Sequence, residues 1–347
     1  GHDKIDVAEP ERFMREVEKC YQQCSAIPAK VSLMRKGTVN FFADPEFPAW
    51  NVEILVRNGQ DEYWEKEKRI KLMNRETGIP SMQKLSRACY LCPTGCIPYL
   101  EINEGKYKGL KGEGLWINTI QAAARFDITD PDVAVKYWNL ANELGLDTDY
   151  ITAGLSWVFE CYEKGIITKE DTGGLELTWG NGNALLKLVR MLAYREGIGN
   201  LLAGGMLEAA KKIGQGSEYY LIHVKGQPSQ EAFRIPKGWS LAVSTSPVAG
   251  RHLRGATQGP DNFGPKGVDF NAIDYKNQPQ VVVWQGKTKE LEDNLGICSY
   301  VGTWNLARFT APANFAELAN SALGLNLTEE EIMNHYAVLG RNLEKAF

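Results

Sequence analysis

The stretch RACYLCPTGCIPYL, residues 87–100, places three cysteines on one short segment and guides the interpretation of the whole chain. Cys89, Cys92 and Cys96 form a CxxCxxxC pattern, and the intervening Pro93 and Gly95 break regular structure. Three thiolates on an irregular loop can bind three corners of a four-iron cube, which leaves the fourth corner to another cysteine. Zinc sites usually combine two Cys or Cys/His pairs, and this chain has no second CxxC. The spacing therefore favours a 4Fe–4S cluster over zinc or a purely structural role.

Four other cysteines compete for the fourth corner. Cys20 and Cys24 lie one turn apart on a predicted helix, and Cys161 occupies an apolar position of another, so core packing is the simpler interpretation of all three. Cys298 lies close to Gly296, where the backbone can turn tightly. The residues alone favour Cys298 only slightly, and the choice stays open at this point.

Composition restricts the class of protein. The chain has 347 residues, 44% of them hydrophobic and 24% charged, with a formal net charge of −4, which indicates a soluble globular protein of about two domains. The absence of a dense basic run argues against nucleic acid as a partner, and no apolar run is long enough to predict a membrane span. Seven cysteines without a disulfide-like spacing favour reduced thiols and a cytoplasmic location. Because the sequence begins GHDKIDV and ends within a predicted helix, we expect it to be a piece of a longer protein.

Most of the chain carries apolar residues at a spacing of three to four, which predicts amphipathic helices. Strands do not alternate with these helices, so the sequence predicts a mainly α fold rather than a doubly wound parallel sheet. Residues 216–285 are rich in Gly and Pro and show little helical period, and we predict two helical domains, 1–220 and 221–347. The helices are predicted at 9–24, 61–76, 114–126, 130–145, 150–165, 183–197, 200–214, 311–324 and 328–346.

Two segments of the chain resemble each other. Aligning Gly145 of ANELGLDTDY (141–150) with Gly296 of LEDNLGICSY (291–300) brings polar residues into register on both sides of each glycine. A carboxylate at a helix end can accept N–H bonds from a heterocycle, although both segments are also compatible with two unrelated helix C-caps. The aligned pairs are Asn142 with Asp293, Leu146 with Ile297, and Asp147 with Cys298.

Taken together, these motifs resemble the aldehyde:ferredoxin oxidoreductase family of tungsten-bispterin enzymes. The CxxCxxxC segment, the loop at 142–147 and the loop at 293–298 occur in the family's order and at similar spacing. The stretches YREGIGNLLAGG (194–205), VKGQPSQEAFR (224–234) and STSPVAGRHLRG (244–255) also resemble the family, and the resemblance covers most of residues 60–347.

The resemblance implies a fold and a set of cofactors. The chain corresponds to the two helical domains of such enzymes, domains 2 and 3, without their N-terminal β domain. Cys298 would be the fourth ligand of a 4Fe–4S cluster, and the two related loops would contact the two pterins of a tungsten or molybdenum centre. The implied pterin contacts are Asn142, Gly145, Leu146, Asp147, Asp293, Gly296 and Ile297.

The resemblance also implies candidates for catalysis. His252 in GRHLRG aligns with the active-site histidine of the family, and an imidazole with a pKa near ~6.5 can transfer a proton at neutral pH. Glu113 in KGEGLW lies close to the position of the family's catalytic glutamate, although the local sequence matches less well. Arg251 and Arg254 flank His252 and are predicted to meet pterin phosphates, with surface charge as the alternative.

On this basis the sequence predicts oxidation of a small aldehyde to a carboxylic acid, with electrons passed through the cluster to ferredoxin or an iron–sulfur partner subunit. The rival hypotheses are a tungsten-pterin aromatic-ring reductase of the benzoyl-CoA type and a non-catalytic iron–sulfur electron-transfer subunit. Asn142 replaces an aspartate common in the family. The Glu-x-x-His pair that bridges some dimers through a metal is missing, so metal-bridged dimerisation is in doubt while a homo-oligomer stays open.

Overall fold

The structure, a computed structural model, divides into two compact units. Unit 1 comprises Gly1–Arg35, Ala88–Thr94 and Phe233–Phe347, and unit 2 comprises Lys36–Arg87 and Gly95–Ala232. The units therefore interleave along the sequence, whereas the sequence analysis predicts two consecutive segments. The described residues are 6–26, 37–39, 43, 54–61, 63–113, 116–229, 236–255, 264–271, 273–302 and 312–346, excluding the side chains of 113 and 116–118.

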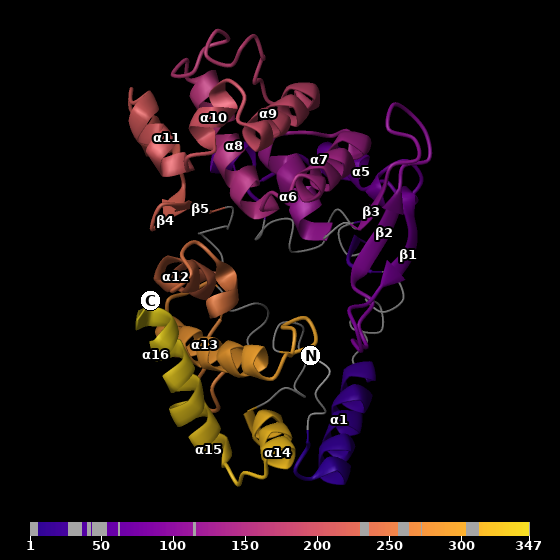
Figure 1. Ribbon diagram of the computed structural model, residues 1–347, viewed down its shortest axis with the longest axis vertical. Coiled ribbons are helices and arrows are strands. Elements are labelled where there is room, and N and C mark those ends of the chain that lie inside the picture. The colour runs from indigo at the N-terminus through magenta and orange to yellow at the C-terminus, as the bar shows by residue number, and fades with distance from the viewer. Residues whose placement is uncertain are drawn as a thin grey trace. The chain divides into compact units, whose positions relative to one another are not determined.

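Helices dominate unit 2, in agreement with the predicted mainly α fold class (Figure 1). Asp130 precedes α7 (Pro131–Glu143) and accepts backbone N–H bonds from Asp132 and Val133, as expected for a cap followed by proline. The other helices of this unit are α5 (Lys66–Leu72), α6 (Trp116–Arg125), α8 (Thr148–Glu163), α9 (Gly182–Tyr194), α10 (Ile198–Leu202) and α11 (Met206–Ile213).

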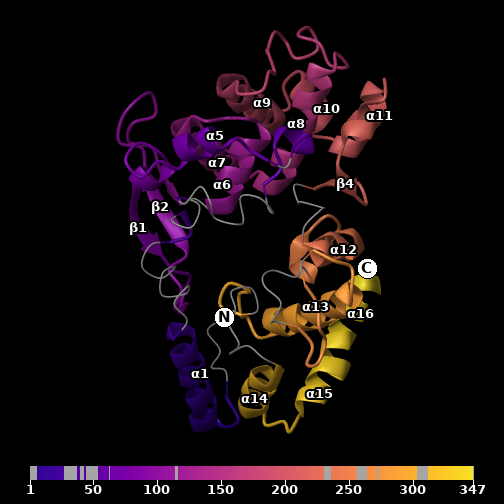
Figure 2. The ribbon, with the colours of Figure 1, turned by 180° about the vertical axis from the view of Figure 1, so that it is seen from behind.

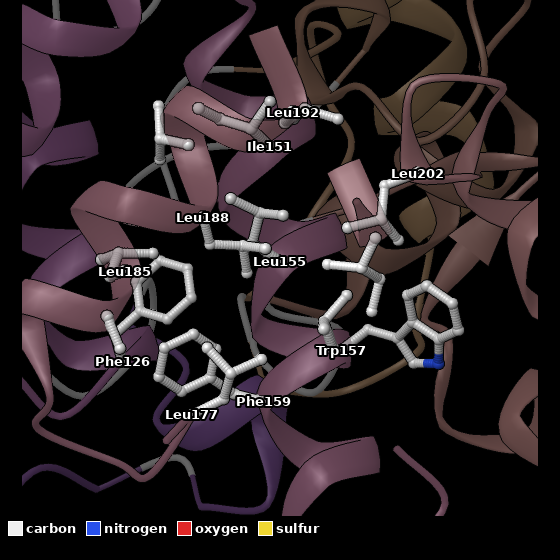
Figure 3. Close-up of a cluster of buried hydrophobic side chains, with 14 of the residues drawn as sticks. Phe126, Ile151, Leu155, Trp157, Phe159, Leu177, Leu185, Leu188, Leu192 and Leu202 are labelled. Atoms are coloured by element: carbon white, nitrogen blue, oxygen red, sulfur yellow. The ribbon is translucent and has the colours of Figure 1, made fainter. Parts of the chain in front are cut away.

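The core of unit 2 is built around α8, whose central residues are almost all buried. Phe126 and Phe159 pack edge to face with their ring centroids 5.2 Å apart, and Leu155 and Leu188 are fully buried beside them (Figure 3). Trp157 donates its indole N–H to the carbonyl of Ser217 at 2.8 Å, so its polar atom is satisfied inside the core. Each such side chain contributes about 1.5–3 kcal/mol by its removal from water.

A three-stranded antiparallel sheet in unit 2 is absent from the sequence-based prediction. It consists of β1 (Gln83–Arg87), β2 (Ile97–Glu101) and β3 (Lys111–Glu113), in the order β1-β2-β3. Its strands are only three to five residues long, and β1 shows no regular alternation of buried and exposed residues, so sequence periodicity gives little signal. A second, two-stranded sheet pairs β4 (His223–Val224) with β5 (Gln227–Pro228).

Unit 1 joins the first helix of the chain to its last helices (Figure 2). In α1 (Pro10–Ser25), the guanidinium of Arg12 makes two hydrogen bonds with Glu317 of α14 (Pro312–Leu323), at 2.6 and 2.7 Å. These bonds hold α1 against the C-terminal part of the chain. The unit also contains α12 (Lys237–Thr245), α13 (Gln278–Asn294), α15 (Glu329–Glu331), one turn of π-helix (Ile332–Tyr336) and α16 (Ala337–Ala346).

Two predicted segments differ from the structure in detail. The single helix predicted at 200–214 is divided into α10 and α11, because Gly205 adopts φ +109° and ends the helical path between them. The segment 216–285, predicted to have little helix, contains α12 and the start of α13. Within the part of the chain that the structure describes, we find no helix with the length and hydropathy of a membrane span.

Candidate functional site

The cysteine loop connects β1 to β2, whose register pairs Arg87 with Ile97. The backbone N–H of Cys92 donates to the carbonyl of Cys89 at 3.0 Å, which closes a tight turn with Leu91 at φ +55°. The N–H of Thr94 donates to the sulfur of Cys92 at 3.4 Å, a contact that favours the thiolate. The loop thus already provides one hydrogen bond to a candidate ligand sulfur.

Cys298 lies near this loop although it is far away in sequence. Burial raises the pKa of the Cys92 thiol, the Thr94 N–H lowers it, and the nearby thiols of Cys298, Cys89 and Cys24 raise it further. These residues all belong to unit 1, and none forms a disulfide. Cys96 belongs to unit 2, where the hydroxyl of Thr38 donates to its carbonyl at 2.9 Å.

Helix α1 supports the cysteine loop, a role that the sequence analysis did not predict. The hydroxyl of Tyr21 donates to the carbonyl of Leu91, next to Cys92. On the same helix, Cys24 is buried in contact with Cys20 and Val301, and the N–H of Val301 donates to the carbonyl of Cys298 at 2.8 Å. Helix α1 therefore contacts both the CxxC turn and the turn that carries Cys298, which spacing along the sequence could not indicate.

The donor atoms around the cysteine loop are thiols and one buried hydroxyl. Among the described residues, no three His, Cys, Asp or Glu side chains form a group that could hold one ion. A four-iron cube accepts thiolates at separate corners, so its ligands need not converge on one point. The hydroxyl of Thr94 is buried without a hydrogen-bond partner among the described residues, and it could donate to a cluster or cysteine sulfur.

The loop after α13 has the backbone of a Schellman C-cap. The N–H of Gly296 donates to the carbonyl of Asp293 at 3.1 Å, and the N–H of Ile297 donates to that of Glu292 at 2.7 Å. Gly296 adopts φ +69°, which favours glycine, and no atom lies within 4 Å of the place where a Cβ would be. The glycine is exposed, which leaves its backbone open to an approaching group.

The loop after α7 has the same backbone arrangement. The N–H of Gly145 donates to the carbonyl of Asn142 at 3.1 Å, and the N–H of Leu146 donates to that of Ala141 at 2.9 Å. Gly145 has φ +67° and is likewise open at its Cβ position. The alignment of the two segments therefore corresponds to one shared C-cap geometry, with open space beside each glycine.

The side chains of the two loops have different partners. Asp147 accepts the N–H of Tyr150 at 2.9 Å and caps the next helix, α8, while the Asn142 amide donates to the carbonyl of Trp138 at 3.0 Å. Asp293 instead pairs with the cations of Lys289 and Arg254. Asp147 and Asp293 keep exposed carboxylates that can accept N–H bonds from a pterin.

The remaining candidate residues lie in two places. His252 begins a short 3-10 helix, His252–Arg254, and stacks on Trp239 of α12 with ring centroids 4.7 Å apart and planes 18° apart. Arg251 precedes it and is half-buried. Glu113 ends β3, where its backbone pairs with Tyr99, and its side chain lies outside the described residues. The catalytic roles of His252 and Glu113 stay predictions.

Comparison with known families identifies one match over nearly the whole chain. Residues 16–347 match the sequence profile of the family described as aldehyde ferredoxin oxidoreductase, domains 2 and 3. The match includes the cysteine loop, both C-cap loops and the His252 turn, so these features fall within the region that defines the family.

Individual relatives support the same grouping. A tungsten-containing aldehyde ferredoxin oxidoreductase of Pyrococcus horikoshii is 25% identical over 96% of this chain and 53% of its own length. The aliphatic sulfonate oxidoreductase WOR-like subunit of Pyrococcus furiosus is 36% identical over 49% of this chain and 28% of its own length. The chain thus spans about half the length of the aldehyde oxidoreductases it matches.

A solved structure has a similar fold. The active-site complex BamBC of benzoyl coenzyme A reductase with 1,5-dienoyl-CoA superposes with a TM-score of 0.75 over 100% of this chain and 59% of that chain. The two sequences are 18% identical, so this likeness concerns the fold alone.

Proposed function

The chain belongs to the aldehyde ferredoxin oxidoreductase family, and on that premise we propose that it forms the cofactor-binding part of an enzyme that oxidises an aldehyde to a carboxylic acid. The cofactors would be a tungsten or molybdenum bis-pterin and a 4Fe–4S cluster. The electron acceptor would be ferredoxin or an iron–sulfur partner subunit, and the reduced thiols support a cytoplasmic location.

The convergence of distant cysteines in unit 1 carries this proposal. Cys298 and Cys89 both lie near Cys92, although 206 positions of the sequence separate Cys92 from Cys298. With Cys96 as the remaining member of the CxxCxxxC pattern, the chain supplies the four thiolates that a 4Fe–4S cluster requires. The backbone N–H of Thr94 donates to the sulfur of Cys92, and the buried Thr94 hydroxyl would donate to a cluster sulfur; hydrogen bonds of this kind tune a cluster's potential.

The two C-cap loops would hold the pterins. In each loop, an exposed glycine leaves room for a flat ring, and a carboxylate, Asp147 or Asp293, would accept ring N–H bonds. Leu146 and Ile297 pack on the hydrophobic cores of their units and fix each loop from behind. Arg251 would supply a cation for the pterin phosphates.

The reaction converts an aldehyde and water to a carboxylic acid, two protons and two electrons. When bound, the tungsten pterin supplies the two-electron chemistry and the cluster supplies transfer of single electrons. His252 would accept and release a proton at a ring nitrogen. Trp239 covers one face of its imidazole and limits its rotation, so the ring is held ready for that transfer. Glu113 would act as a general base on water or orient the carbonyl.

Metal analysis of the full-length, anaerobically purified protein tests this proposal. We expect tungsten or molybdenum, a pterin, four iron atoms per chain and the EPR spectrum of a reduced 4Fe–4S cluster, together with reduction of ferredoxin when an aldehyde is added. Iron without tungsten, molybdenum or pterin would support the iron–sulfur electron-transfer subunit instead, and absence of the cluster would reject the proposal.

Two other substrate classes should be tested. A relative that is 36% identical over 49% of this chain is named an aliphatic sulfonate oxidoreductase WOR-like subunit, and an aromatic-ring reductase of the benzoyl-CoA type is the rival hypothesis from the sequence. The same protein should therefore be assayed with an aliphatic sulfonate and with an aromatic acyl-CoA. If the protein converts either compound and no aldehyde, the proposed cofactors would stand and that compound would replace the aldehyde as the proposed substrate.

A further inference from the structure

The carboxylate of Asp293 is held by two cations, one on each oxygen. Lys289, one turn earlier on α13, donates to Oδ1, and Arg254 donates to Oδ2. The Lys289 side chain is only 12% exposed, so its charge is largely removed from water and depends on Asp293 for compensation. Two fixed donors on opposite oxygens allow Asp293 little freedom to rotate.

Arg254 is itself fixed at both its side chain and its backbone by α16. Its Nη1 atom contacts Asp293, while Nη2 pairs with Oε1 of Glu344 at 2.8 Å. One turn earlier on α16, Arg341 donates from Nη1 to the carbonyl of Arg254 at 3.3 Å. A guanidinium shared between two carboxylates suits the planar fork of arginine, which a lysine cannot reproduce.

The same arginine belongs to the turn that carries His252. His252 and Arg254 lie in one 3-10 helix, so anchoring Arg254 limits the movement of His252. Trp239 of α12 stacks on the imidazole of His252 and restricts its rotation, while Arg254 is fixed at the opposite end of the turn. The second C-cap loop, the histidine turn and α16 are therefore connected through Arg254.

We propose that Lys289, Arg254 and Glu344 are positioning residues that hold the Asp293 carboxylate and the His252 turn in one fixed arrangement for the pterin. This inference rests on the proposed function. It assigns Arg254 to an internal bridge between Asp293 and Glu344, in place of a contact with pterin phosphate, because both ends of its guanidinium have carboxylate partners.

Replacing Lys289 by Met tests the inference most directly. The change keeps an unbranched side chain of similar shape, one atom shorter, but leaves one oxygen of Asp293 without its cation. In the full-length protein carrying its cofactors, we expect pterin retention to fall about tenfold, as for the loss of other outer contacts to a cofactor ligand. We also expect an altered tungsten EPR signal, while iron stays at four atoms per chain.

A matched control is available on the same helix. Lys287→Met removes the same charge from α13, but Lys287 donates to Asn334 at 2.8 Å and not to Asp293. It should leave pterin content and the tungsten signal unchanged. Arg254→Lys should keep more pterin than Arg254→Met, and Glu344→Gln should weaken retention less than Lys289→Met because it acts through Arg254.

The outcomes separate the inference from the proposed function. Wild-type pterin content and an unchanged tungsten signal in both Lys289→Met and Arg254→Met would overturn the inference and leave the proposed function intact. Equal loss of iron and pterin with a lower melting temperature would show a general structural role and also overturn it. A wild-type protein without pterin or tungsten would reject the inference and the proposed function together.

Discussion

The two C-cap loops share one backbone but use it differently. After α7, the loop that contains Gly145 returns directly into a helix, and Asp147 caps that helix through the N–H of Tyr150. After α13, the loop that contains Gly296 leads to an exposed thiol, Cys298, near Cys92. The backbone hydrogen bonds of the loops 142–147 and 293–298 are nearly identical. Their last residues, Asp147 and Cys298, have different chemical roles.

This difference shows how one local motif serves two purposes. A Schellman cap requires only a glycine in the left-handed region and an apolar residue after it, which leaves the flanking polar positions free to vary. In the first loop, the side chains of Asn142 and Asp147 make their hydrogen bonds within α7 and α8, the helices on either side of the loop. In the second loop, Asp293 pairs with Lys289 on its own helix, but it also pairs with the distant Arg254, and Cys298 lies near the distant Cys92.

The largest expected effect is that of replacing Cys298, the last residue of the second loop, on the cluster content. Cys298→Ala should remove the fourth thiolate, and we expect loss or severe damage of the cluster, measured as iron per chain and by EPR. Asp147→Ala at the equivalent position, and Cys24→Ala in the buried cysteine of α1, should keep four irons. An intact four-iron spectrum in Cys298→Ala, with normal helicity by circular dichroism, would remove Cys298 from the ligand set.

The second effect concerns the histidine turn, which is linked to the second loop through Arg254. His252→Asn should lower aldehyde turnover by about 100-fold or more, because a positioned proton-transfer group contributes at least that factor. Tungsten and iron content should stay at wild-type values. Unchanged kcat across the pH range would exclude His252 from the mechanism, and loss of metal would indicate a structural role.

The third effect compares the two glycines. Gly145→Ala and Gly296→Ala should each lower the free energy of unfolding by about 1–2 kcal/mol, since both need the left-handed conformation. No neighbouring atom would clash with either methyl group, so the two costs should agree within the error of denaturant titration. A much larger cost at one site would mean that the two backbones are not equivalent in solution.

The smallest effect is that of the helix cap. Asp147→Ala should destabilise the protein by about 1 kcal/mol, because the backbone N–H of Tyr150 loses its acceptor. Asp147→Asn retains an oxygen acceptor and should recover most of that loss in thermal unfolding. If both variants unfold like the wild type, Asp147 does not stabilise α8, and the contrast between the loops would weaken.

Local signals in the sequence predicted much of the fold. The Asp130-Pro131 start and the Gly145 stop of α7 are confirmed, because capping depends on residues close in sequence. The sheet around the cysteine loop was missed because its strands are very short. The position of α1 was missed because the contacts of Arg12 and Tyr21 reach residues far along the chain.

The sequence by itself determined most of the helices, the caps of α7, the CxxCxxxC spacing and the family, but it missed α12 and α13. Only the tertiary structure decided that α1 supports the cysteine loop, that Arg254 pairs with Asp293, and that α16 anchors Arg254. The physical reason is that caps and turns depend on neighbouring residues. Ion pairs and thiol contacts depend on how distant segments pack, and no local pattern records that packing.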